Sequence, residues 1–400
     1  MTVQRIAPQN EAEAGDAVRD AGEKGASLEI VSGGTKRDFG RPTRADAILD
    51  VAAISGILKY EPEELVLTMR AGTPVAEIEA ALAAKKQMLG FSPADWGPLF
   101  GAPEGRATLA GIVATNACGS RKVKAGAVRD HVIGCRFVNG NGEAIKAGGR
   151  VIKNVTGFDL PKLMCGAFGT LGVLTELTMR VSPAPERVAG LVILNCAAET
   201  GLGVLRRAAR LAVDATGLAY LPYHAMTRSE VLDADGSGIA LIRVDGTAPA
   251  VSEKLALLRS EFKDHDLALL EADRTDALFR EIGNGSFFAK ADGDIWRLCV
   301  PASQAYTASQ DAGAHLWYAD WAGGLLWLEA PANDETALRL RGITKRVGGH
   351  ATLMRAADAV RARLAVFEPE TPARATLTRA VKAAFDGKHV LNPGRMFEGI

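Results

Sequence analysis

The chain has 400 residues, 48% of them apolar and 24% charged, which is the balance of a soluble globular protein of about two to three domains. Lysine plus arginine and aspartate plus glutamate are equal at 47 each, so the basic excess of a nucleic-acid-binding or membrane-surface protein is missing. The sequence has no apolar run of transmembrane length, no signal-peptide core and no C-x-x-C motif, and its cysteines are scattered, so we expect a cytoplasmic protein with reduced thiols and no metal site.

The N-terminal part of the chain predicts a small α/β unit followed by an amphipathic helix. The polar stretch 9–24 favours a helix, and three apolar runs favour strands. These strands are expected at 28–31, 47–51 and 65–69. Thr73 and Pro74 then predict a helix start with Thr73 as the N-cap, because proline is favoured in the first helical turn. This helix would end near residue 85 and bury Val75, Ile78 and Leu82.

Two patterns indicate sheet structure in the next part of the chain. The Asn139-Gly140 pair between strand-like arms is a strong hairpin signal. The run 173–181 alternates apolar and polar side chains, which is typical of a strand with one buried face. Pro183 and Pro185 then mark a boundary, because proline interrupts regular structure.

Residues 186–345 predict a separate α+β domain, because helix and strand patterns alternate there without glycine-rich loops. The expected strands are 191–194, 239–244, 295–300 and 325–328. The expected helices are 199–213, 249–264 and 332–346. A last helix should start at Thr371-Pro372 and end at Gly387, with apolar positions Leu377, Val381 and Phe385. The sequence shows no internal repeat.

Three glycine-rich stretches, near residues 31–35, 108–130 and 166–173, predict a site for a large anionic cofactor. Glycine has no Cβ to hold a phosphate away, and successive backbone N–H groups form an anion-binding concavity. Neither the Rossmann nor the P-loop fingerprint occurs. Any one of these loops could equally be a simple tight turn, but three loops beside strand-like runs favour a common cofactor site.

The same stretches resemble a known family. The strings that resemble the FAD-binding domain of the vanillyl-alcohol oxidase/p-cresol methylhydroxylase (PCMH) superfamily are 32–35, 110–117, 128–134 and 169–176. Within it, the strings 153–160, 348–352 and 392–397 resemble the FAD-binding E subunit of bacterial glycolate oxidases. The resemblance extends from about residue 28 to 397.

This resemblance implies an α+β fold in which a two-part PCMH-type FAD-binding domain carries an inserted, ferredoxin-like cap domain. We expect the FAD-binding domain at 1–183, the cap or substrate domain at 184–350, and a C-terminal segment at 351–400 that packs back on the FAD-binding domain. FAD would be bound non-covalently. Superfamily members that tether FAD through the first loop use a histidine where this chain has Thr35.

The resemblance also implies which residues line the cofactor. The loop 32–36 would contact the pyrophosphate, and Arg395 would neutralise cofactor charge, with capping of the preceding helix as an equal alternative for Arg395. The expected cofactor-binding residues are Ser32, Gly33, Gly34, Thr35, Lys36, Pro93, Leu109, Ala110, Gly111, Ala114, Thr115, Asn116, Gly119, Gly126, Val128, Val132, Gly169, Leu171, Val173 and Arg395.

His350 and Arg355 are the candidate catalytic residues. His350 follows two glycines and could face the flavin as a base, although a loop histidine held by backbone hydrogen bonds is the alternative interpretation. Related D-2-hydroxyacid dehydrogenases carry a His-x-Gly-Asp-Gly-Asn-x-His string, which is missing here, and the six histidines of this chain are widely spaced. The base and metal of those enzymes are therefore not expected in this chain.

We therefore predict the FAD-binding subunit of a glycolate oxidase-type complex that oxidises a small 2-hydroxy acid, glycolate to glyoxylate, with electrons leaving through the flavin. The expected partners are a second flavoprotein subunit and an iron–sulfur subunit. The complex would be cytoplasmic, with or without peripheral membrane association. The alternatives are a self-sufficient flavin-dependent D-2-hydroxyacid dehydrogenase and a structural subunit with a vestigial flavin site.

Overall fold

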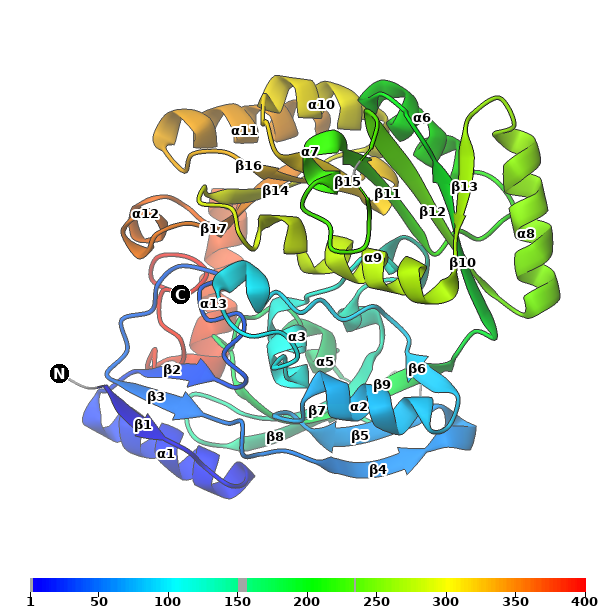
Figure 1. Cartoon of the computed structure of the whole chain (residues 1–400). Helices are drawn as coiled ribbons and strands as arrows, with labels where there is room; N and C mark the ends of the chain where they lie inside the picture. Colours follow the sequence, from blue (N-terminus) through cyan, green and yellow to red (C-terminus); the bar gives the residue numbers. More distant parts are fainter. Residues whose placement is uncertain (1–2, 150–156, 234) are drawn as a thin grey trace. The chain divides into compact units, whose positions relative to one another are not determined.

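The computed structural model describes residues 3–149, 157–233 and 235–400, and it divides the chain into two compact units (Figure 1). The first unit comprises Met1–Ala117, Ala127–Ala184 and Pro369–Ile400. The second unit comprises Cys118–Gly126 and Pro185–Glu368. Helices and strands are mixed in both units, which confirms the α+β class. The string 153–160 lies outside the described residues except for its last four positions.

The two units differ from the expected domains in two places. Strand β17 (His350–Arg355) belongs to the second unit, because it pairs along its length with β14 (Ile295–Cys299). The segment Cys118–Gly126 also belongs to the second unit, where the indole nitrogen of Trp321 donates to the carbonyl of Gly119 at 3.2 Å. Both contacts join residues far apart in sequence, so local patterns could not reveal them.

The first unit begins with a small parallel sheet of strand order β1-β3-β2. The strands are β1 (Gln4–Ile6), β2 (Leu28–Val31) and β3 (Ala47–Asp50). Helix α1 (Glu11–Lys24) crosses between β1 and β2 and packs Ala14 and Val18 into the same core. Its ends are well defined, because the Asn10 side chain accepts from the backbone N–H of Glu13 and Gly25 ends the helix at φ 64°.

A larger antiparallel sheet completes the core of the first unit. Its order is β4-β5-β9-β7-β8, and β6 pairs with the far end of β9. The strands are β4 (Ile57–Glu61), β5 (Val66–Arg70), β6 (Gln87–Leu89), β7 (Val132–Val138), β8 (Ala144–Gly148) and β9 (Val173–Pro183). The expected hairpin is confirmed between β7 and β8, where the Asn139 side chain accepts from the backbone N–H groups of Asn141 and Glu143.

Besides α1, which agrees with the helix predicted at 9–24, the first unit has four α-helices among its described residues. They are α2 (Val75–Ala83), α3 (Leu109–Thr115), α5 (Leu160–Met164) and α13 (Pro372–Asp386). Helix α2 buries the expected Val75, Ile78 and Leu82. However, it starts after Pro74 without a side-chain cap, because the Thr73 hydroxyl donates to the carbonyl of Arg70 instead.

Helix α13 buries a charged pair more completely than its apolar positions. Its fully buried side chains are Lys382 and Asp386, which pair at 2.7 Å, while Leu377 is 63% exposed. The Lys382 ammonium also donates to the carbonyls of Thr170 and Leu391, so every polar group at this buried site has a partner. Val381 and Phe385 are half-buried beside this pair, and the ring centroid of Phe385 lies 6.0 Å from that of Phe137.

The second unit contains one antiparallel sheet of order β13-β10-β12-β11-β15-β16-β14-β17. Its strands are β10 (Arg187–Ile193), β11 (Gly217–Pro222), β12 (Gly238–Gly246), β13 (Leu267–Leu270), β14, β15 (Trp317–Asp320), β16 (Leu325–Glu329) and β17. Each half of the sheet has a β-α-β-β-α-β order with the strand arrangement of a ferredoxin-like unit. The two halves join where β11 meets β15, so the structure contains a repeat that the sequence did not show.

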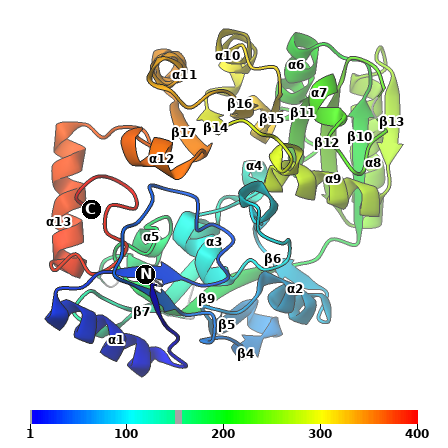
Figure 2. The same cartoon turned by 60° about the vertical axis from the view of Figure 1, so that its left-hand side comes forward.

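Four helices of the second unit cover one face of its sheet and form its main core with that face (Figure 2). The helices on this face are α6 (Ala198–Ala208), α8 (Ala248–Glu261), α10 (Ala305–Ala312) and α11 (Asp334–Val347). The remaining ones are α4 (Lys122–Ala125), α7 (Tyr223–Met226), α9 (Ala272–Asn284) and α12 (Asp358–Arg363). Across the described residues of both units, no helix is long and apolar enough to cross a membrane.

Candidate functional site

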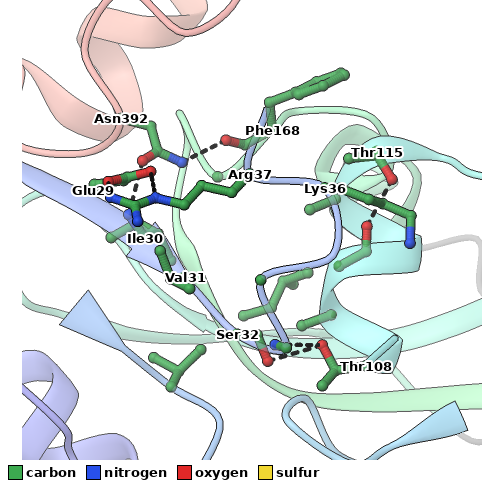
Figure 3. Close-up of a pocket in the computed structure, with 18 of the residues that line it drawn as sticks. Glu29, Ile30, Val31, Ser32, Lys36, Arg37, Thr108, Thr115, Phe168 and Asn392 are labelled. Atoms are coloured by element: carbon green, nitrogen blue, oxygen red, sulfur yellow. Dashed lines mark hydrogen bonds and ion pairs between the residues drawn. The ribbon is translucent and has the colours of Figure 1, made fainter. Parts of the chain in front are cut away.

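A cavity of about 840 Å³, including its mouth open to solvent, lies within the first unit (Figure 3). Its wall is formed by the end of β2 and the loop after it, by α3, by the segment around Phe168, and by the C-terminal residues Asn392 and Arg395. Four stretches distant in sequence therefore meet around one site. The glycine-rich loops recognised in the sequence supply three of them.

The loop after β2 approaches its neighbour so closely that one glycine has no substitute. A Cβ on Gly33 would lie 2.1 Å from the carbonyl oxygen of Arg106, far inside van der Waals contact. The Thr108 hydroxyl fixes this approach, because it donates to the Ser32 hydroxyl at 2.8 Å (Figure 3). The next residue, Gly34, has a left-handed φ of 76°. Bare backbone thus lines this side of the cavity.

A single asparagine connects three parts of the opposite wall. The Asn392 side chain accepts from the backbone N–H of Ile30 at 2.8 Å and donates to the carbonyl of Phe168 at 2.7 Å (Figure 3). Phe168 and Gly169 both have left-handed backbone, with φ values of 53° and 69°. This non-glycine strain at Phe168 is of the kind that clusters at binding sites.

The first loop of the cavity wall carries two cationic side chains in different environments. Lys36 is only 7% exposed, and burial lowers the pKa of its ammonium to about 8, against the opposing effect of the Asp95 carboxylate. The guanidinium of Arg37 forms a two-pronged ion pair with Glu29, at 2.8 and 2.6 Å. Lys36 is therefore the buried cation of the first loop, whereas the charge of Arg37 is balanced locally.

Arg395 lies in the cavity wall, as expected, but its guanidinium holds the first loop in place. It donates to the carbonyls of Lys36 and Arg37 and reaches the Thr43 hydroxyl at 3.4 Å. These contacts hold the loop that carries Lys36, and neutralisation of cofactor charge by Arg395 stays a prediction.

The structure brings together about half of the expected cofactor-binding residues. Those in the cavity wall are Ser32, Gly33, Gly34, Thr35, Lys36, Ala110, Gly111, Ala114, Thr115, Gly169 and Arg395. Those of the first unit outside that wall are Pro93, Leu109, Asn116, Val128, Val132, Leu171 and Val173. Gly119 and Gly126 belong to the second unit. Cofactor contact by each of these residues stays a prediction.

Several wall residues were not among the expected cofactor-binding residues. They are Glu29, Ile30, Val31, Arg37, Val51, Thr108, Met164, Ala167, Phe168, Gly172, Leu174 and Asn392. Asn392 lies in the string 392–397 noted for its resemblance, and Thr108 lies in the second glycine-rich stretch, so the sequence held a signal for both. Val51 and Met164 gave none, because each reaches the cavity only through the fold.

The two candidate catalytic residues lie on β17 in the second unit, in different settings. His350 stands opposite Cys299 of β14 and shares a hydrogen bond with it, which raises the pKa of His350 against the effect of burial. The guanidinium of Arg355 donates instead to the carbonyls of Phe288, Ala291 and Gly293. This geometry gives Arg355 a structural role and does not support the catalytic one.

The second unit also pairs two histidines that the sequence separates widely. The rings of His224 and His315 have centroids 3.9 Å apart, and Tyr223 lies edge-on to His224 at 5.6 Å. Even so, no group of three or more His, Cys, Asp or Glu side chains able to hold a metal ion occurs among the described residues.

The cavity of the first unit is suited to a dinucleotide. Its glycine-lined side has no room for a Cβ, its loop carries the buried cation Lys36, and its opposite wall is largely apolar. These are the features that a phosphate-bearing cofactor with a large aromatic ring system requires. Flavin bound there supplies the group that accepts a hydride from a substrate carbon.

Comparisons with known proteins agree with this assignment. The sequence model of the FAD binding domain family matches residues 4–148. The chain is 32% identical over 371 residues to glycolate oxidase subunit GlcE of Escherichia coli (strain K12), covering 92% of each chain. It is 28% identical over 246 residues to glycolate oxidase subunit GlcD of Bacillus subtilis (strain 168), covering 59% of this chain and 49% of that one. Its fold matches p-cresol methylhydroxylase with a TM-score of 0.73, at 15% identity, over 98% of this chain and 88% of that one.

Proposed function

The chain belongs to the family of FAD-binding oxidoreductases that includes glycolate oxidase subunit GlcE, and from this premise we propose that it is the FAD-binding subunit of a glycolate oxidase-type complex. The observation that carries the proposal is the cavity of the first unit. Its bare glycine backbone coincides with the region that the FAD-binding family model matches. The substrate would be a small 2-hydroxy acid such as glycolate, oxidised to glyoxylate.

The residues of the first unit would bind and orient the cofactor. The backbone around Gly33 and Gly34 would approach the pyrophosphate, and the Lys36 ammonium would supply positive charge beside it. Asn392 connects β2 to the segment around Phe168, and Arg395 holds the loop after β2. The flavin would be held without a covalent bond, since Thr35 stands where tethered relatives have a histidine.

We further propose that the isolated chain reacts slowly and that full activity needs partner subunits. Oxidation of a 2-hydroxy acid requires a base for the hydroxyl proton, and such assistance is typically worth about 10²–10⁴-fold in rate. This chain lacks the paired-histidine string of related dehydrogenases, and among its described residues no metal-binding cluster occurs. A second flavoprotein subunit would supply that machinery, and an iron–sulfur subunit would take the electrons onward, in a cytoplasmic complex.

His350 is the residue of this chain proposed to act as a base if the isolated chain does turn over. The test is anaerobic mixing of the FAD-loaded chain with glycolate while the visible flavin absorption is followed. We expect slow bleaching or none for the chain alone. Rapid bleaching that disappears in His350→Ala would instead establish the alternative, a self-sufficient flavin-dependent dehydrogenase.

A further inference from the structure

A cluster of titratable side chains lies on the sheet face of the second unit opposite helices α6, α8, α10 and α11. On β14, Trp296 and Leu298 point into the helix-covered core, so the alternate residues Arg297 and Cys299 point to the opposite face. His350, directly opposite Cys299 on β17, shares this face. Arg297 and Cys299 are half-buried and His350 is exposed, so solvent reaches all three.

A second cation joins Arg297 from a distant part of the chain. The Lys122 ammonium lies 3.9 Å from the centroid of the Trp321 indole, and the Arg297 guanidinium carbon lies 5.3 Å from the same ring. The segment that carries Lys122 is fixed in this position, because the Ser120 hydroxyl donates to the Asp320 carboxylate at 2.8 Å. Two positive charges are thus held beside one aromatic ring.

The turn that carries this ring is strained. Trp321 and Ala322 are consecutive residues with left-handed φ values of 54° and 58°. Such a conformation is a genuine outlier for a bulky residue, and it persists only where surrounding contacts determine it. Here the indole nitrogen donates to the carbonyl of Gly119 at 3.2 Å, which holds the ring in place. Strain retained at such a spot is typical of a binding site.

The charges of the cluster act on one another. Burial favours the neutral thiol of Cys299, but the hydrogen bond with His350 and the positive charges of Arg297 and Lys122 outweigh it and lower the pKa of Cys299. Two carboxylates lie near the cluster. Asp320 is fully buried, and burial raises its pKa to about 6. Glu368 accepts from the backbone N–H of Ala351 at 3.3 Å, and its charge contributes to the raised pKa of His350. Arg297, Lys122 and His350 thus bring three basic groups to this face beside these carboxylates.

We propose that these side chains, Arg297, Lys122, Cys299 and His350 (the Arg297 cluster), form a binding site for a small carboxylate anion. A guanidinium and an ammonium on a partly dehydrated aromatic surface are the groups that bind carboxylates tightly. The choice of a carboxylate ligand rests on the proposed function, because 2-hydroxy acids carry this group. Inorganic phosphate shares the same chemistry and is the alternative anion that the experiment must separate.

Cys299 allows the site to be tested without flavin or turnover. Iodoacetate carries a carboxylate on a two-carbon frame, whereas iodoacetamide is its neutral equivalent. In either reaction the sulfur–carbon bond forms as the carbon–iodine bond breaks, iodide leaves, and the thiol proton passes to His350 or to solvent. Mass spectrometry of the Cys299 peptide gives the iodoacetate-to-iodoacetamide rate ratio in the folded chain and, as the intrinsic reference, in the urea-unfolded chain.

The proposal predicts that folding raises this ratio by about tenfold, since a carboxylate drawn to the two cations raises the local reagent concentration. Glycolate should protect Cys299, and Lys122→Gln should return the ratio towards the unfolded value. The matched control is Lys124→Gln on the same helical turn, because Lys124 pairs with Asp214 and not with Trp321. It should leave the ratio unchanged.

Several results would overturn the proposal. One is an iodoacetate-to-iodoacetamide rate ratio at Cys299 that is the same in the folded and the unfolded chain. A second is a Cys299 that neither reagent alkylates in the folded chain. Another is protection by inorganic phosphate but not by glycolate, which would assign the site to a different anion. FAD content measured on the same samples separates these outcomes from a failure of the proposed function, because loss of flavin does not alter the alkylation ratio.

Discussion

Replacing Gly33 with alanine should weaken FAD binding sharply while leaving the fold intact. The new Cβ would lie 2.1 Å from the carbonyl oxygen of Arg106 and 3.0 Å from the Thr108 methyl carbon, so the loop must move to accept it. Overpacking of this kind costs about 1–3 kcal/mol. If the cost falls on the cofactor-binding conformation, the FAD dissociation constant rises by about 5- to 150-fold, because about 1.4 kcal/mol corresponds to a factor of ten.

Substitutions at two further glycines distinguish the effect of a steric clash from the effect of backbone strain. Gly34 has a left-handed φ of 76°, and its nearest contact for a Cβ is the carbonyl of Ser32 at 3.9 Å, so Gly34→Ala adds strain without a clash. Gly25 has a similar φ of 64° at the end of α1 and meets nothing within 4 Å. Left-handed alanine costs about 1–2 kcal/mol, so both substitutions should lower the urea midpoint. Gly25→Ala, away from the cavity, should leave FAD affinity unchanged.

The assay is titration of the apoprotein of each variant with FAD, followed by flavin fluorescence, together with the urea midpoint of the same sample. The expected order of FAD affinity is wild type and Gly25→Ala, then Gly34→Ala, then Gly33→Ala. A folded Gly33→Ala variant that binds FAD as tightly as the wild type would refute the assignment of this loop to the cofactor.

Three other substitutions or treatments give distinct expected outcomes. Acid precipitation should leave the flavin in the supernatant, because Thr35 offers no histidine for a covalent bond, and colour in the pellet would contradict this. The folded pKa of Lys36, about 8, lies below its ordinary 10.5, so its burial costs stability mainly below pH 8. Lys36→Met should therefore stabilise the apoprotein at pH 7, with a gain of up to about 3 kcal/mol in the free energy of unfolding and a higher urea midpoint. This gain in stability should shrink as the pH rises from 8 towards 10.5. A gain independent of pH would show that Lys36 is not a buried cation. Lys382→Met should cost about 3–5 kcal/mol, because it leaves the Asp386 carboxylate buried without its cation, while the exposed Lys388→Met should cost almost nothing. Equal urea midpoints for the two lysine variants would contradict the buried pair.

Much of the first unit followed from local patterns in the sequence. Strand β2, helix α1 and the β7–β8 hairpin have strong signals of their own, namely a short apolar run, an N-cap with a terminal glycine, and an Asn-Gly turn. The glycine loops also pointed to the cavity before its shape was known. In each case the physical cause lies within a few residues of its effect.

The parts that the sequence did not predict depend on distant contacts. Strands β11 and β15 were not predicted from the sequence, yet they join the two halves of the large sheet. Helix α13 buries a charged pair whose partners come from Thr170 and Leu391, which no periodicity can register. The cavity residues Val51 and Met164 are ordinary apolar side chains that the fold places at the site.

The Arg297 cluster illustrates the same limit at a candidate site. His350 attracted attention in the sequence because two glycines precede it, but Cys299, Arg297 and Lys122 carried no motif. Antiparallel pairing sets Cys299 opposite His350, and the Ser120–Asp320 hydrogen bond brings the Lys122 segment to the same face. Arg355, the other candidate catalytic residue, donates to backbone carbonyls between residues 288 and 293.

The most direct test of the account is the visible absorption spectrum of the purified chain after incubation with FAD and removal of the excess. The cavity of the first unit predicts flavin bands corresponding to about one FAD per chain, and these bands should be strongly reduced in Gly33→Ala. A wild-type chain that stays colourless after this treatment would contradict FAD binding and leave a structural subunit with a vestigial site as the remaining interpretation.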